Sequence, residues 1–298
     1  MSELLREQRA QLGERSVRCL RGGEGRRLLL LLHTGIPGRS AFAGSADLFA
    51  DLAARLDLDG FRVLAPDLPG AGGTDLRGLE DLTPDGIVAF LHELLREEDD
   101  FDSIDVLAHG ESSLAALKLT REGFRETPVR SCFLLAPNAA APVGDSLQNL
   151  ALLVPPLPRW SRRSQRWAVE RLAYFPDRVP AELVDRFVAN AEGEPHGNAA
   201  ELLRDQANGA TLLSSNIQAQ DELFAYCRDV SYQVPVTIFW GAEDPTASVP
   251  RGIVLASVLA GGPAPLDFQL LNRCSHFAQF DRAPEVGRML RAALLRAG

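Results

Sequence analysis

The sequence predicts an α/β fold: a mostly parallel, twisted sheet with helices on both faces and an inserted helical cap. Short apolar runs that end in Gly- and Pro-containing loops alternate with helical patterns up to about residue 136. From about Pro137 to Ser231 this rhythm stops, and it resumes at Val234. A chain of 298 residues is long enough for one such domain with an insertion.

Apolar runs of strand length define the first part of the predicted sheet. The clearest is Leu28 to Leu32, whose continuous apolar character is typical of a strand buried on both faces. Residues 1–15 are polar and helix-permissive, and we expect them to be an extension of the fold. Helices are expected over residues 42–56 and from the N-cap Thr83 to about Arg96. The expected strands cover residues 16–20, 28–32, 62–67, 104–109 and 129–136.

The later part of the chain completes this plan. We expect the core to comprise residues 1–137 and 232–298, with residues 138–231 as the cap. The cap segment has helical patterns and no convincing strand, and a separate helical domain is the alternative. Strand patterns then resume at 234–240 and 268–271, and a helix is expected from Pro284.

Composition narrows the class of protein. A net charge of −9 argues against nucleic acid or an anionic membrane surface as partner. The four cysteines show no Cys-x-x-Cys spacing, so we expect reduced, mostly buried thiols and neither a disulfide framework nor a zinc site. The N-terminus lacks an apolar signal core. These features predict a soluble, cytoplasmic protein. We also expect a small-molecule substrate and no cofactor or metal.

The segment from Ile104 to Leu117 is a strand, a small-residue turn and a helix in immediate succession. A nucleophile elbow, usually Gly-x-Ser-x-Gly, has this context. Here the turn reads Ala108-His109-Gly110-Glu111-Ser112, so Gly110 stands where the nucleophilic serine is expected. The alternative register makes Ser112 or Ser113 the nucleophile, but it lengthens the strand and moves the serine into the first helical turn.

Two later loops carry an acid and a base. Asp244 follows the strand at 234–240, and His276 follows the strand at 268–271. Because ligands of open parallel sheets bind beyond the carboxyl ends of the strands, Gly110, Asp244 and His276 are expected to converge. A carboxylate that accepts from one imidazole nitrogen leaves the other nitrogen as a general base. The less specific alternatives are a surface-loop histidine and a turn or helix-capping aspartate.

The order of these motifs resembles the α/β-hydrolase superfamily over nearly the whole chain. The resemblance implies that residues 33–38 form an oxyanion loop, opened by His33 and Thr34. Backbone N–H groups of Thr34, Gly35 or Glu111 would then stabilise an oxyanion or enolate. The remaining matching segments are Asp67-Leu68-Pro69-Gly70 with Thr74-Asp75, the elbow, Trp240-Gly241-Ala242-Glu243-Asp244 and Ser275-His276-Phe277.

Gly110 and Glu111 set the chemistry that we expect. Glycine forms no acyl-enzyme, so His276 would act on a substrate C–H or O–H or on water, in volume left vacant at Gly110. Glu111 has two interpretations. Its carboxylate raises the pKa of a nearby imidazole or transfers a proton itself, or it is a solvated or Arg-paired residue at a helix N-terminus. His109 is interpreted as structural.

Three functions fit this pattern. The first is a C–O lyase or cyclase that uses the His276–Asp244 pair. The resemblance suggests the acetate-eliminating enzymes of tetronate polyketide pathways, which act on natural-product intermediates. The second is a hydrolase that works through His276-activated water, or through a displaced Ser112. The third is a catalytically silent binding protein, although the retention of Asp244 and His276 weighs against it.

Overall fold

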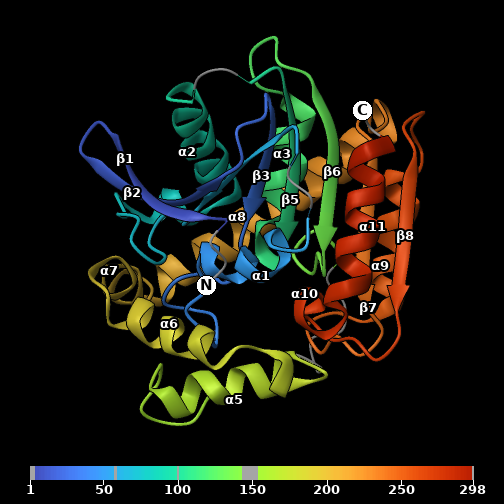
Figure 1. The fold of residues 1–298 in the computed structure, drawn as a ribbon. Helices are drawn as coiled ribbons and strands as arrows, with labels where there is room; N and C mark the ends of the chain where they lie inside the picture. The colour runs from blue at the N-terminus through green and yellow to red at the C-terminus, as the bar shows by residue number, and fades with distance from the viewer. Residues whose placement is uncertain (1–3, 57–58, 99–100, 143–153, 297–298) are drawn as a thin grey trace.

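The fold is organised around one eight-stranded sheet in the order β1-β2-β4-β3-β5-β6-β7-β8 (Figure 1). The computed structural model describes residues 4–56, 59–98, 101–142 and 154–296. The strands from β4 to β8 in this order pair in parallel, whereas β1 and β2 pair antiparallel with each other and β2 pairs antiparallel with β4. The predicted α/β fold with a mostly parallel sheet is therefore confirmed.

Every predicted strand is present, and one strand was not predicted. The expectation of a helix-permissive extension at residues 1–15 is wrong, because Arg6–Leu12 is an edge strand in a hairpin with β2. Most of its side chains are exposed, so it lacks the apolar alternation that reveals a strand. The strands are β1 Arg6–Leu12, β2 Arg15–Gly22, β3 Arg27–Leu32, β4 Phe61–Pro66, β5 Ser103–His109, β6 Val129–Leu135, β7 Val236–Gly241 and β8 Leu266–Leu271.

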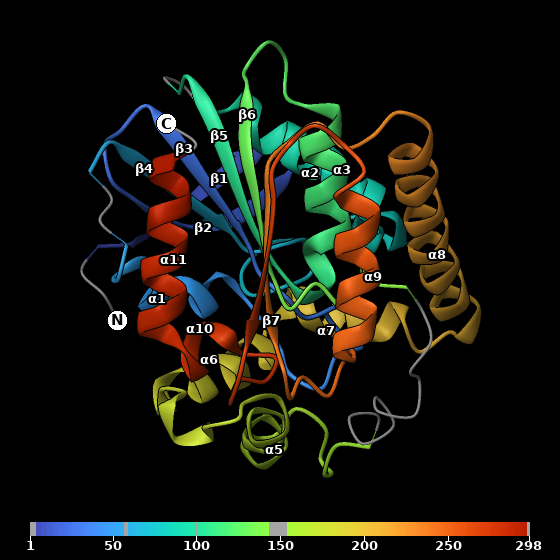
Figure 2. The same cartoon turned by 90° about the vertical axis from the view of Figure 1, so that its right-hand side faces the viewer.

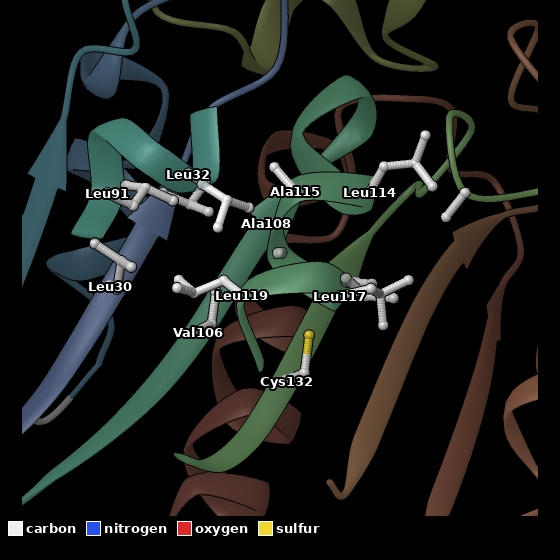
Figure 3. Close-up of a cluster of buried hydrophobic side chains, with 14 of the residues drawn as sticks. Leu30, Leu32, Leu91, Val106, Ala108, Leu114, Ala115, Leu117, Leu119 and Cys132 are labelled. Carbon is white, nitrogen blue, oxygen red and sulfur yellow. The ribbon is translucent and has the colours of Figure 1, made fainter. Parts of the chain in front are cut away.

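Helices cover both faces of the sheet (Figure 2). One face carries α2 (Pro84–Arg96), α3 (Ser113–Glu122) and α9 (Val249–Leu259), and the other carries α1 (Ala50–Ala53) and α11 (Ala283–Arg296). Figure 3 shows α3 packed on β3, β5 and β6 through residues such as Leu117, Val106 and Cys132.

The predicted helix boundaries hold in two cases out of three. Thr83 caps α2, since its hydroxyl accepts from the Gly86 N–H at 3.0 Å, and α11 begins one residue before Pro284. The expected helix over 42–56 is wrong, because helical turns occupy only Ala46–Phe49 and Ala50–Ala53. Phe42 packs instead against cap residues and Phe277, so its apolar character serves tertiary contacts rather than a helix.

In the described residues between β6 and β7 the α-helices are α5 (Arg162–Leu172), α6 (Ala181–Glu192), α7 (Glu194–Leu202) and α8 (Gln206–Asp229). No strand occurs in the described part of this segment, residues 136–142 and 154–235. The second half of α8 packs on the core through Leu223 and Cys227. The last helix of the insertion therefore supports the sheet as well as the cap, and the division at residues 138 and 231 stays a prediction.

All four cysteines are free and buried, as expected. Burial raises the pKa of the Cys132 thiol to about 12, which makes it an inert side chain of the core. Within the described residues no helix is long and apolar enough to cross a membrane. The same residues contain no group of His, Cys, Asp and Glu side chains arranged to hold a metal ion.

Candidate active site

The elbow turn follows directly from β5. His109 ends the strand, Gly110 adopts a left-handed conformation with φ of +56°, and a short 3-10 turn over Gly110–Ser112 leads into α3. A Cβ at Gly110 would lie 3.0 Å from His276 Nε2, so the glycine stands where a nucleophile would face the imidazole. The same Cβ would lie 2.2 Å from Thr34 Oγ1. The expected vacant volume is therefore wrong: the Thr34 side chain fills it.

Asp244 and His276 form a buried pair beyond β7 and β8. His276 Nδ1 lies 3.0 Å from Asp244 Oδ2, and the two side chains are 2% and 0% exposed. The other carboxylate oxygen accepts from the Thr246 N–H and hydroxyl, each at 2.7 Å. The carboxylate thus holds the proton of His276 on Nδ1 and leaves Nε2, which faces Gly110, as the basic nitrogen. Neither residue lies in a surface loop environment.

The charges around His276 favour its protonated form. Burial lowers the pKa of the imidazole, but the charge and hydrogen bond of Asp244 and the charge of Glu111 raise it, and the net shift is upward. The base is therefore stronger than an isolated imidazole. Two carboxylates on different loops act together on this histidine.

Glu111 binds the oxyanion loop with its own carboxylate. Its Oε2 accepts from the Gly35 N–H at 3.1 Å and from the Thr34 hydroxyl. The Thr34 hydroxyl in turn accepts from the Glu111 N–H at 3.3 Å. The donors Gly35 N–H and Glu111 N–H, expected to be open to a substrate oxyanion, are therefore engaged within the protein. No arginine pairs with Glu111 among the residues that the structure describes.

The side chains of His33 and His109 support the loops. His33 Nε2 accepts from the Leu68 N–H at 2.9 Å, and its Nδ1 bonds Thr34 O at 3.0 Å. His33 is completely buried, so its imidazole ties the oxyanion loop to the loop after β4. His109 Nε2 bonds the backbone carbonyl of His276 at 2.9 Å, and the two rings lie 4.7 Å apart. Both imidazoles therefore hydrogen-bond to backbone groups of the loops.

Ser112 is held away from His276. Its hydroxyl donates to the carbonyls of Leu32, at 2.9 Å, and His109, at 3.0 Å, and the residue is 1% exposed. The Ser113 hydroxyl is buried without a hydrogen-bond partner. A serine that is to act as nucleophile must contact its base, so this geometry does not favour the alternative register.

Two adjoining cavities open beside the elbow, with volumes of about 260 and 220 Å³. His276 lines the larger one, together with Phe42 and Leu172, and α8 contributes Leu213 and Ile217 to the smaller one. The five residues that line both are Ile36, Arg39, Glu111, Asn138 and Thr246. Sequence reasoning missed Arg39, Asn138 and Thr246. Asn138 and Thr246 each stand just after a strand, which was the available signal.

Side chains of the cap helices hydrogen-bond to the backbone of the loop between β3 and α1. Gln165 of α5 accepts from the Ala43 N–H at 3.0 Å, and Asn190 of α6 donates to the Ala43 carbonyl at 3.1 Å. His196 of α7 accepts from the Gly38 N–H at 3.2 Å. Burial lowers the pKa of His196 to about 4, with a smaller contribution from Arg159. The neutral imidazole is therefore the form that binds the loop.

The fold and the site together combine an α/β sheet, an elbow turn, a buried carboxylate–histidine pair and a helical cap. The model of the alpha/beta hydrolase family matches residues 29–288, and the chain belongs to this family. No curated protein sequence matches the chain.

Solved structures show the same fold at low sequence identity. The chain is 20% identical, with a TM-score of 0.71, to a 2-hydroxy-6-oxo-6-phenylhexa-2,4-dienoate hydrolase from Rhodococcus sp. strain RHA1, over 98% of this chain and 99% of that one. It is 15% identical, with a TM-score of 0.75, to a meta-cleavage product hydrolase from Pseudomonas fluorescens IP01, over 99% of both chains. That structure is a serine-to-alanine variant complexed with acetates. A putative lipase from Acinetobacter baumannii AYE is 18% identical, with a TM-score of 0.74, over 98% of this chain and 92% of that one.

Proposed function

We propose that the protein is an acid/base enzyme of the α/β-hydrolase fold that eliminates a carboxylate, a C–O lyase without a covalent intermediate. One observation carries the proposal. The nucleophile position is Gly110, its side-chain space is filled by Thr34, and a buried Asp244–His276 pair still faces it. Chemistry at this site therefore relies on proton transfer rather than on attack by the protein.

The elimination follows from these groups. His276 Nε2 takes a proton from a carbon next to a substrate carbonyl, and the electron pair of that C–H bond forms a C=C bond. The neighbouring C–O bond breaks, and its electron pair leaves with the carboxylate. Asp244 stabilises the imidazolium, which then returns its proton to solvent or to the released carboxylate. Substrates of this kind include acylated β-hydroxycarbonyl compounds such as polyketide intermediates, and an intramolecular addition afterwards would make the enzyme a cyclase.

Glu111 supports elimination over hydrolysis. Hydrolysis needs oxyanion donors that are free to stabilise a tetrahedral intermediate, and here the Gly35 N–H and the Thr34 hydroxyl bind Glu111. In elimination the developing charge is on the departing carboxylate. No tetrahedral intermediate forms, so elimination does not require that Glu111 release these two donors.

Hydrolysis through His276-activated water is the second candidate, because the solved relatives named above include two hydrolases and the same base can activate water. The third candidate, a silent binding protein, has less support, since the site retains a buried imidazole 3.0 Å from a carboxylate, the geometry that an acid/base pair needs.

The three candidates are separated with an acetylated β-hydroxyketone in ¹⁸O-labelled water. Elimination releases acetate without ¹⁸O and an unsaturated ketone, whereas hydrolysis at the acyl carbon puts ¹⁸O into the acetate. Wild-type protein is expected to release unlabelled acetate, to lose this activity in His276→Ala, and to remain unlabelled by a serine-directed phosphonate. Labelled acetate would make it a hydrolase, and activity that survives His276→Ala would refute the assigned base.

A further inference from the structure

Asn138 has one side-chain atom, Oδ1, that nothing in the described protein satisfies. Its Oδ1 is buried and has no hydrogen-bond partner, yet the residue lines both cavities. Buried polar groups are nearly always paired, so an unpaired one beside a cavity indicates a group that a ligand completes. The amide oxygen and nitrogen are interchangeable by rotation, so the unpaired position can hold the nitrogen, which there would donate to a ligand.

The backbone before Asn138 is held in an uncommon conformation. Ala136 has φ of +44°, in the left-handed region that residues with a Cβ rarely adopt. The turn is closed by a bond from the Asn138 N–H to the Ala136 carbonyl at 2.7 Å, and the Ala136 N–H donates to Phe239 O at 2.8 Å. Strain of this kind concentrates at binding and catalytic sites. Here it directs the chain at the end of β6 so that Asn138 reaches the cavities.

Arg39 supplies the positive charge of the same wall. It comes from the oxyanion loop, is exposed and lines both cavities. Its guanidinium makes a single long contact, to Gly209 O at 3.5 Å, and no carboxylate lies within 4.0 Å of it in the described part of the chain. Glu111, which lines the same cavities, is bound to Thr34 and Gly35 instead. Arg251, which lines the smaller cavity, donates to the carbonyls of Ala141 and Pro142.

We infer that Arg39 and Asn138 form a subsite for a carboxylate group of the substrate, at a distance from the bond that His276 acts on. The guanidinium is the donor that carboxylate-like oxygens prefer, and the amide completes the pairing. The apolar walls from Leu172, Leu213 and Ile217 hold the carbon skeleton. The inference rests on the proposed function for the reaction, but the binding itself does not depend on catalysis.

The test uses hexanoate and hexanamide, which share a chain length and differ in charge, in ligand-observed NMR titrations at pH 8. The protein is the His276→Ala variant, which keeps the subsite without the base. Hexanoate is expected to bind about tenfold more tightly than hexanamide, because a charge-assisted bond is roughly that much stronger than a neutral one. Arg39→Gln should remove this preference and leave hexanamide binding unchanged. Asn138→Asp should weaken hexanoate binding alone, by charge repulsion.

The control is Arg204→Gln, an exposed arginine of the cap that pairs with Glu201 and lines neither cavity. It should leave both affinities unchanged. Equal affinity for the two ligands would overturn the subsite. The subsite would also be overturned if Thr34→Val loses hexanoate binding while Arg39→Gln keeps it, since the anion would then bind in the oxyanion loop. If the Arg39-dependent preference is found but wild type yields no unsaturated product, the subsite stands and the lyase fails. If wild type yields the unsaturated product but shows no preference for hexanoate, the lyase stands and the subsite fails.

Discussion

A serine restored at Gly110 is expected to destabilise the protein, and the structure divides the cost into two parts. The left-handed φ of +56° costs a residue with a Cβ about 1–2 kcal/mol. The new Cβ would also lie 2.2 Å from Thr34 Oγ1 and 2.9 Å from Thr34 Cβ. Overpacking of this kind costs about 1–3 kcal/mol. The free energy of unfolding should therefore fall by roughly 2–5 kcal/mol.

A double-mutant cycle separates the two parts. Thr34→Gly removes the two Thr34 atoms that lie nearest the new Cβ, so the cost of Gly110→Ser should fall towards about 1–2 kcal/mol in that background. Gly13→Ser is the control, because Gly13 has φ of +59° and the heavy atom nearest its ideal Cβ position is the end of the Arg77 side chain, at 3.8 Å. The measurement is urea unfolding followed by tryptophan fluorescence. If Gly110→Ser costs no more than Gly13→Ser, and Thr34→Gly does not relieve it, the argument that Thr34 fills the nucleophile space is refuted.

The same variants report on chemistry. With Thr34 present, the serine of Gly110→Ser is displaced from His276, and a serine-directed phosphonate should not label it. In the double variant, the serine Cβ keeps His276 Nε2 at 3.0 Å without the two Thr34 atoms, and labelling should appear. Labelling of the single variant, seen by intact-mass spectrometry, would mean that Thr34 moves aside without cost.

Three further results are expected. His276→Ala should lower the rate of elimination by about 10²–10⁴-fold, measured as release of the unsaturated product, and an unchanged rate would exclude this base. Because His276 acts as a neutral base with a raised pKa, kcat/KM should rise with pH through a value above 6.5. Glu111→Gln removes a charge that raises that pKa, so the rise should move to lower pH, and a shift in the other direction would contradict the electrostatic argument. His196 has a folded pKa of about 4 against 6.5 in an unfolded chain, so the unfolded state takes up the proton first as the pH falls. The free energy of unfolding should then drop by about 3 kcal/mol between pH 6.5 and 4. His196→Gln should flatten this part of the urea-midpoint profile, and an equally steep profile in the variant would assign the loss to other groups.

The fold was predictable wherever the sequence carries a local period. The continuous apolar run at 28–32 predicts a strand, and Thr83 before Pro84 predicts a helix start, because both depend on neighbours along the chain. The edge strand Arg6–Leu12 was not predictable in this way, since its stability comes from pairing with β2 while its side chains face solvent. The segment from Phe42 likewise has helical spacing, but contacts with the cap decide its conformation.

The sequence by itself determined the elements of the site: a glycine at the elbow, and an acid and a histidine after the strands that follow. Those assignments rest on strand order, since parallel strands present their carboxyl ends at one edge. Only the tertiary structure decided that Thr34 fills the space beside Gly110 and that the Glu111 carboxylate occupies the oxyanion loop. The physical reason is that Thr34 and Glu111 lie 77 residues apart in the chain, and their contact depends on the register of β3 against β5. No local sequence pattern encodes a contact between residues so far apart in the chain.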